Sequence, residues 1–239
     1  AIVVDADGQR REVAVKILRP GIERQFRRDL DSFYFAARLI ERLAARLGPG
    51  RVFGIALADD HRPERGWKKL TSFEADLHGL RGTALFLDID IVIVGDITPF
   101  FELPGEFLII HDWKRPWRIT GNSSVYRFEL GAHADVLAYF RSHVEEVRSN
   151  FRHEQAYLSD FIHRQGRMGY WPADWCRSYK YHCVPRWPLN HFRAPSIPEG
   201  ARILIFHGVV NPPDALIGER NSNWRHMLPA PWIADHWVE

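Results

Sequence analysis

The chain has 239 residues, of which 46% are apolar and 26% are charged, and its formal net charge is +2. This composition is that of a soluble globular protein with enough chain to bury a substantial core. It gives no case for a nucleic-acid partner or a polybasic anchor, and there is no apolar run of about 18 residues to form a transmembrane segment. The two cysteines, Cys176 and Cys183, form neither a disulfide framework nor a zinc spacing, so we expect reduced thiols and a cytoplasmic location.

The first 50 residues are predicted to form a unit of their own. Apolar runs at residues 2–4 and 12–18 flank Asp5-Ala6-Asp7-Gly8, a pattern typical of a β-hairpin whose glycine supplies a positive φ. Over residues 22–47 apolar side chains recur in steps of three and four, which predicts an amphipathic helix of about seven turns. Gly48-Pro49-Gly50 is the best domain boundary. Because the first residue is alanine within a strand-like run, we expect a truncated N-terminus.

The stretch DGQRREVAVKILRPGIERQFRRDL within residues 1–47 resembles the atypical kinase family of ubiquinone biosynthesis. In that family a Val-Ala-Val-Lys strand supplies the lysine that binds the nucleotide phosphates, and Lys16 falls on it. Phosphoryl transfer also needs a catalytic-loop Asp and Asn and a metal-binding Asp-Phe-Gly, and none of these occurs downstream. The resemblance therefore implies a fragment of a kinase lobe without kinase chemistry. The alternative role for Lys16 is that of a solvated strand-helix unit that serves only in packing.

The remainder, residues 51–239, alternates predicted strands and helices. This pattern indicates an α/β fold with functional groups at the strand ends. The predicted elements are strands at 52–58, 83–87, 91–94, 107–110, 124–128 and 203–206, a short helix beginning at 67–70, and helices over 136–151 and 154–164.

The segment 82–101, GTALFLDIDIVIVGDITPFF, sets two aspartates between two short buried strands. Asp88 and Asp90 stand two positions apart at a strand end, so both carboxylates can face one ion. Burying two carboxylates is costly unless a charge offsets them, and a hard divalent cation prefers such oxygen ligands. An aspartate pair that merely caps a turn is the alternative, since Asp-x-Asp is a common sequence.

Five motifs occur in the order RGWKKL, LFLDID, GNSSVYRF, HEQAYL and IFHG. From about Arg65 onward this order resembles bacterial nucleotide-sugar glycosyltransferases of the GT-A fold, similar to the glycogenin-like family. The resemblance implies a mixed sheet flanked by helices, a UDP-sugar or related donor, and a glycan or lipid-linked acceptor, which would allow peripheral membrane association. It also implies retention of anomeric configuration.

The resemblance assigns roles to individual residues. For the metal, Mn²⁺ or Mg²⁺, Asp90 matches a direct ligand, Asp88 shares the ion or holds the ribose, and His207 matches the histidine ligand. Without the resemblance, a single strand-end histidine is more simply a hydrogen-bonded core residue. The substrate-binding positions are Lys69, Asp88, Asn122, Ser123 and Gly208. Glu154 and Gln155 match a catalytic Asp-Gln pair beside the transferred sugar, with Glu154 in place of Asp.

Two departures from the family pattern leave alternatives open. Residues 51–68 are too short to hold the expected uridine-binding strand and helix, and the kinase-like segment occupies that place. After the His-Gly turn, Asn211 precedes two prolines where the family has a phosphate-neutralising lysine. The alternatives to a glycosyltransferase are an inactive nucleotide-binding or fusion protein of the same fold, and a fragment related to the atypical kinases.

Overall fold

The chain forms two compact units, residues 1–53 and 54–239. The structure is a computed structural model that describes residues 2–4, 10–12, 67–77, 79–88, 90–208, 210–218 and 226–236. In the first unit, β1 (Ile2–Val4) pairs antiparallel with β2 (Arg10–Glu12), where the sequence predicts a hairpin. The predicted helix over 22–47, Lys16, the boundary at 48–50 and the predicted strand at 52–58 lie outside the described residues.

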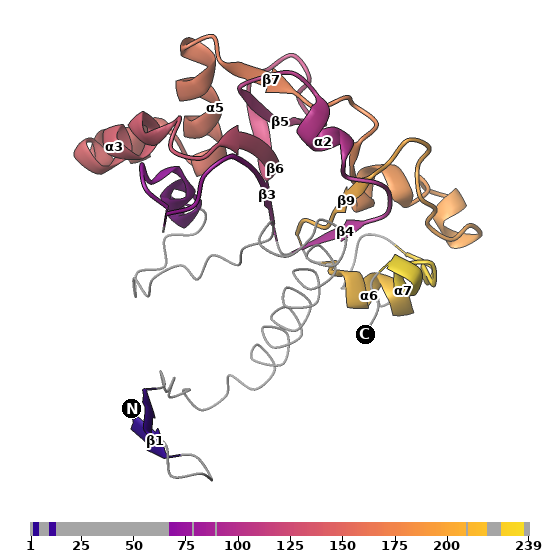
Figure 1. Cartoon of the computed structure of the whole chain (residues 1–239). Helices are drawn as coiled ribbons and strands as arrows, with labels where there is room; N and C mark the ends of the chain where they lie inside the picture. Colours follow the sequence, from indigo (N-terminus) through magenta and orange to yellow (C-terminus); the bar gives the residue numbers. More distant parts are fainter. Residues whose placement is uncertain are drawn as a thin grey trace. The chain divides into compact units, whose positions relative to one another are not determined.

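The second unit is mixed α/β, with two mixed sheets flanked by helices, as the sequence predicts (Figure 1). None of the helices in the described ranges is long and apolar enough to cross a bilayer. The elements of this unit are η1 (Trp67–Phe73), β3 (Thr83–Leu87), β4 (Ile91–Ile93), α2 (Pro99–Glu102), β5 (Phe107–His111), β6 (Gly121–Glu129), α3 (Ala134–Ser142), α4 (Val144–Asn150), α5 (Glu154–Arg164), β7 (Met168–Tyr170), β8 (Cys176–Ser178), η2 (Tyr179–Cys183), η3 (Leu189–His191), β9 (Ile203–Ile205), α6 (Pro212–Ile217) and α7 (Ile233–His236).

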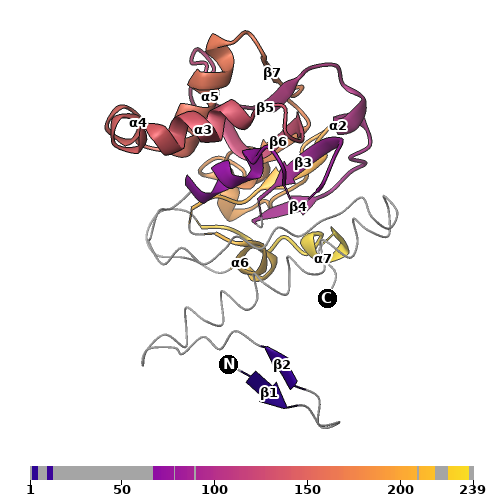
Figure 2. The ribbon, with the colours of Figure 1, turned by 60° about the vertical axis from the view of Figure 1, so that its left-hand side comes forward.

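The larger sheet has the order β3-β6-β5-β7, and only its β5–β7 pair is parallel. Helices α3, α4 and α5 lie together on one side of this sheet, and α2 lies on the other side (Figures 1 and 2). The 3₁₀ helix η1 joins the helical layer, because Leu70 and Phe73 are buried in the same core as Tyr126 of β6 and Tyr157 of α5. This packing holds η1 and α5 against one face of β6, and the candidate site forms there.

The smaller sheet has the order β4-β9-β8 and carries its own core. Val92 of β4 and Leu204 of β9 pack with Tyr179 of η2, Ala215 of α6 and Ile233 of α7, all of them almost fully buried. Strand β4 therefore belongs to a different sheet from β3, although only three residues separate the two strands. Asp88 and Asp90 lie in that connection between the sheets.

One predicted helix proves to be two. The spacing of apolar residues over 136–151 predicts a continuous helix, but α3 ends at Ser142 and α4 begins at Val144. Between them His143 leaves the helical region, with φ −132° and ψ 36°. Val144 and Val147 keep the spacing of three and four because α4 restarts at the very next residue, so the break leaves no mark on the apolar pattern. The short elements α2, β7, β8, α6 and α7 are also absent from the sequence prediction.

Candidate functional site

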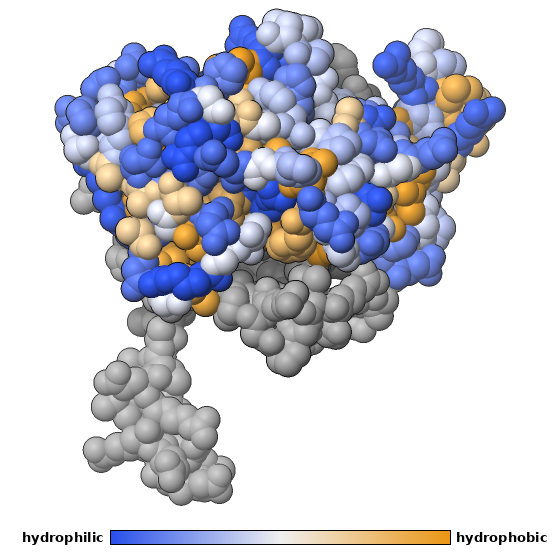
Figure 3. Space-filling view, turned by 45° about the horizontal axis from the view of Figure 1, so that its top comes forward, coloured by the Kyte–Doolittle hydropathy of each residue, from blue (hydrophilic) through white to orange (hydrophobic). Residues whose placement is uncertain are grey.

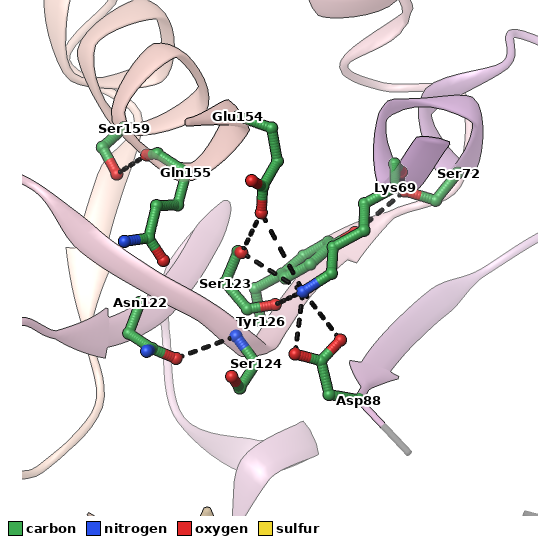
Figure 4. Close-up of polar contacts among 10 residues, drawn as sticks. All are labelled: Lys69, Ser72, Asp88, Asn122, Ser123, Ser124, Tyr126, Glu154, Gln155 and Ser159. Carbon is green, nitrogen blue, oxygen red and sulfur yellow. Dashed lines mark hydrogen bonds and ion pairs between the residues drawn. The ribbon is translucent and has the colours of Figure 1, made fainter. Parts of the chain in front are cut away.

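The centre of the site is the ammonium group of Lys69. Its Nζ lies 2.7 Å from both carboxylate oxygens of Asp88 and 3.9 Å from Oε1 of Glu154 (Figure 4). It also lies 3.4 Å from the carbonyl oxygen of Ser123, to which it donates. All four residues are largely shielded from solvent, so their charges are screened less than on an open surface. Four of the predicted motifs thus meet around one cation.

The placement of Lys69 follows from the packing of η1. Leu70 and Phe73 point into the core, and the hydroxyl of Ser72 lies 3.0 Å from that of the fully buried Tyr126. Ser72 Oγ also donates to the carbonyl of Lys69 at 2.7 Å, which ties the lysine backbone to the core side of the turn. With one face of η1 fixed in this way, the Lys69 side chain projects toward β6 and the end of β3 (Figure 4).

Ser123 and Glu154 are the most buried members of the Lys69 group. Ser123 Oγ donates to Glu154 Oε1 at 2.6 Å, and Glu154, the first residue of α5, is only 7% exposed. The face that Ser123 occupies depends on an irregularity in β6. Strand β5 pairs Ile109 with Tyr126 but Ile110 with Asn122, which leaves extra residues on β6 between these two partners. Such a bulge interrupts the alternation of side chains between the two faces of a strand. A strictly alternating pattern therefore does not predict the face on which Ser123 lies.

Asn122 and Gln155 lie beside this group, at the start of β6 and in the first turn of α5 (Figure 4). Asn122 Oδ1 accepts a hydrogen bond from the backbone N–H of Ser124 at 2.9 Å, and within the described residues its amide nitrogen donates no hydrogen bond, so it can serve a ligand. The Ser159 hydroxyl accepts from the N–H of Gly121 at 2.8 Å and donates to the carbonyl of Gln155 at 2.6 Å. The backbones that carry the two amides are therefore tied together.

Asp90 is the most perturbed carboxyl of the site. Burial raises its pKa from the ordinary 3.8 to about 6, and the negative charge of Asp88 adds to the effect. Two backbone hydrogen bonds fix the connection: Asp88 N–H donates to Ser124 O at 2.9 Å, and Phe206 N–H donates to Asp90 O at 2.8 Å. The main chain at Asp90 is therefore next to the strand end that carries His207. That the Asp90 carboxylate and the His207 imidazole share one ion stays a prediction.

The His207 imidazole lies in an aromatic and basic setting. Its Nε2 is 2.7 Å from Ser178 Oγ, and its ring stacks on Trp113 with centroids 5.9 Å apart and an interplanar angle of 17°. Burial lowers its pKa, and the positive charge of Lys180 lowers it further, so the neutral imidazole is favoured. Gly208 follows at φ +92°, a conformation that favours glycine at this turn.

The three predicted metal ligands do not already form a cluster. Among the residues that the structure describes, no group of three or more His, Cys, Asp or Glu side chains is arranged to hold a metal ion. The Asp88 carboxylate instead binds Lys69, while Asp90 has an electrostatic environment that a cation would relieve. The roles of Asp88, Asp90 and His207 as ligands stay predictions.

Sequence reasoning missed the partners of His207. Ser178 is a small polar residue in a short strand, and no pattern marks it. Trp113 stands in a loop rich in Trp, Pro and Arg, and its Nε1 donates to the carbonyl of Cys176 at 3.0 Å. It also lines a cavity of about 210 Å³ together with Asp112 and His182. None of the Lys69 group lines this cavity, whereas Trp113 and His182, which do, neighbour His207.

No protein-family model matches the chain. Among solved structures, the galactosyltransferase LgtC, in complex with donor and acceptor sugar analogues, is 15% identical and overlays with a TM-score of 0.39, covering 55% of this chain and 54% of LgtC. The apo form of the glycosyltransferase GlyE of Streptococcus pneumoniae TIGR4 is also 15% identical, with a TM-score of 0.43 over 60% of this chain and 38% of GlyE. The chain thus spans about half or less of the length of these proteins. Overlays with scores this low carry no conclusion about activity.

Proposed function

We propose that residues 54–239 form a metal-dependent glycosyltransferase of the GT-A type. It moves a hexose from a nucleoside-diphosphate sugar, of which a UDP-sugar is the first candidate, to a glycan or lipid-linked acceptor. The observation that carries this proposal is the convergence of Lys69, Asp88, Ser123 and Glu154, which come from four separate motifs, into one charged group. Motifs that matched by chance would have no reason to meet in space.

The carboxylates fit a divalent cation. Lys69 neutralises Asp88, while burial and the charge of Asp88 raise the pKa of Asp90, so a cation beside Asp90 would offset the cost of its buried charge. Mg²⁺ sites commonly use one or two carboxylates and complete their coordination with substrate phosphates, so the protein ligands need not be assembled before the substrate binds. Asp90 and Asp88 would hold the ion together with the neutral imidazole of His207. When bound, the ion would neutralise the charge that builds up on the departing diphosphate.

The remaining residues account for the sugar. Positive charge develops on the sugar ring as the leaving group departs, and the buried Glu154 carboxylate can stabilise it. Ser123 and Lys69 fix the orientation of that carboxylate through the bond at 2.6 Å and the contact at 3.9 Å. The amides of Asn122 and Gln155, beside the same end of β6, have the donors and acceptors to bind sugar hydroxyls (Figure 4).

A second function is favoured by one observation, namely that Asp88 is already neutralised through both of its carboxylate oxygens. A site whose lysine and carboxylate already neutralise each other suits a domain that binds a nucleotide without transferring sugar. The contact between Lys69 and Asp88 distinguishes the two functions. In a transferase, the lysine or the carboxylate must leave this contact when the donor binds. Substrate binding should then change the environment of Lys69.

A thermal-shift panel tests the proposal directly. The full chain is melted with UDP, GDP, ADP and CDP, each with Mn²⁺ and with EDTA, and then assayed for release of nucleoside diphosphate from UDP-sugars. A shift that needs both one nucleotide and Mn²⁺, together with turnover, is expected of a transferase. The same shift without turnover on any donor and acceptor supports the binding domain instead.

Variants of the proposed metal ligands test the metal dependence of this shift. Asp90→Asn should abolish the metal-dependent shift, and His207→Ala should weaken it less because water can take the vacated position. Asp235→Asn, at an exposed position in α7, removes the same charge far along the chain and should leave the shift unchanged. Unchanged metal-dependent binding of the nucleotide sugar in Asp90→Asn would show that the proposed mechanism is wrong.

A further inference from the structure

A loop on the second unit presents large apolar side chains to solvent. Its base is closed by the hydrogen bond from Ser196 N–H to the carbonyl of the buried Cys183, at 3.1 Å. Inside it, the buried Asn190 side chain donates to the carbonyl of His226 at 2.8 Å, and the rings of His191 and His226 stack 4.6 Å apart. Residues 184–195, which we call the aromatic loop, are therefore held in place by contacts at their base and with His226.

The aromatic loop exposes three apolar side chains within six residues. Trp187 is 80% exposed, Phe192 is 79% exposed and Leu189 is 47% exposed. The segment projects at the right-hand edge of Figure 1, in orange, and the same edge of Figure 3 shows hydrophobic atoms directly beside hydrophilic ones. Large apolar side chains that are exposed together mark an interaction site.

The charged residues in this stretch of the sequence are all basic. Arg186 and Arg193 bracket the apolar residues and are both exposed, and within the described part of the chain neither guanidinium takes part in an ion pair. Lys180 and Arg177 add two more cations, and no Asp or Glu occurs between residues 175 and 198. Exposed aromatic side chains flanked by cations are complementary to an anionic surface that has an apolar interior.

We propose that the aromatic loop docks on anionic phospholipid bilayers, with Trp187, Leu189 and Phe192 entering the interface and Arg186 and Arg193 binding lipid phosphates. Tryptophan is favoured at the boundary between headgroups and acyl chains, and basic side chains are attracted to anionic leaflets. With no carboxylate between residues 175 and 198, the loop presents cations and apolar side chains, the combination that an anionic bilayer attracts. The proposal rests on this surface alone and is independent of the proposed chemistry.

Vesicle co-sedimentation of the full chain tests the proposal. Vesicles of phosphatidylcholine are compared with vesicles that also contain phosphatidylglycerol, at low and high salt. Binding should require phosphatidylglycerol and weaken with salt. The double variant Trp187→Ser with Phe192→Ser should lose it, and Arg186→Gln and Arg193→Gln should each weaken it about fivefold. Trp117→Ser is the matched control, because Trp117 is 77% exposed in another loop, and it should bind like the wild type.

Several outcomes would overturn the proposal. They are equal binding by the wild type and the Trp187→Ser/Phe192→Ser variant, equal loss in Trp117→Ser, and binding that ignores lipid charge. Light scattering provides the check on self-association. A dimer that dissociates only in the Trp187→Ser/Phe192→Ser variant would identify the partner as a second copy instead of a membrane. Matching thermal melts of all variants establish that the substitutions leave the fold intact.

Discussion

Asp90→Asn should stabilise the metal-free protein. Burial and the neighbouring Asp88 raise the pKa of Asp90 from 3.8 to about 6, so the folded protein holds this proton more tightly than the unfolded chain does. Below about pH 3.8 the carboxyl is neutral in both states and has no effect on stability. As the pH rises toward 6 the unfolded chain ionises first, and the folded state loses stability by up to about 3 kcal/mol, which persists at higher pH. Asparagine cannot ionise and escapes this penalty.

The assay is thermal unfolding in EDTA across the range from about pH 4 to pH 8. For a unit of this size 1 kcal/mol shifts Tm by about 2–4 °C, so Asp90→Asn should melt about 6–12 °C above the wild type at the alkaline end and converge with it at the acid end. Asp235→Asn serves as the control for removing one exposed negative charge. Adding Mn²⁺ should reverse the order if Asp90 is a ligand. Parallel curves for wild type and Asp90→Asn across the whole range would refute the reasoning.

Three further predictions concern the same core. Lys69→Met leaves the carboxylates of Asp88 and Glu154 without their shared cation. It should lower the free energy of unfolding, measured by urea titration, by about 1–3 kcal/mol, and Lys69→Arg should recover part of that loss. Ser123→Ala removes the hydroxyl that donates to the buried Glu154, and should destabilise by about 1–2 kcal/mol in the same titrations, whereas an unchanged midpoint would mean that the bond contributes nothing. Burial raises the pKa of the Cys183 thiol to about 12, so this cysteine should resist a thiol-reactive dye near pH 8 until the protein unfolds, and rapid labelling of the native state would contradict its burial.

The sequence predicts this fold well where one physical rule acts alone. Helix α5 begins and ends where its amphipathic pattern does, and β3 is bounded by glycine and aspartate as expected. The rule is ambiguous at His143, because a helix that stops and restarts keeps its apolar spacing. It is silent about short elements such as β8, whose three residues are too few to show a period.

In the candidate site, the sequence likewise identifies some residues but not the contacts that they make. Its charged members, such as Lys69 and Glu154, are marked by motifs, and the structure brings them within ionic reach. The ion pair between Lys69 and Asp88 could not be predicted, because it depends on how η1 packs against β6. Similarly, the face on which Ser123 lies depends on the irregular pairing of β5 with β6, which leaves no signature in composition or spacing.

The hydroxyl of Ser159 has a consequence for redesigning this protein. By accepting from Gly121 N–H and donating to Gln155 O, it links the start of β6 to the first turn of α5 through hydrogen bonds. The backbone positions of Asn122 and Gln155 are thus fixed relative to each other. Substituting either residue should change the side chain in the site without moving the backbone that carries it. A library that varies these two positions while keeping serine at 159 should therefore sample new ligand preferences on a constant scaffold. The same library built on Ser159→Ala would confound preference with geometry.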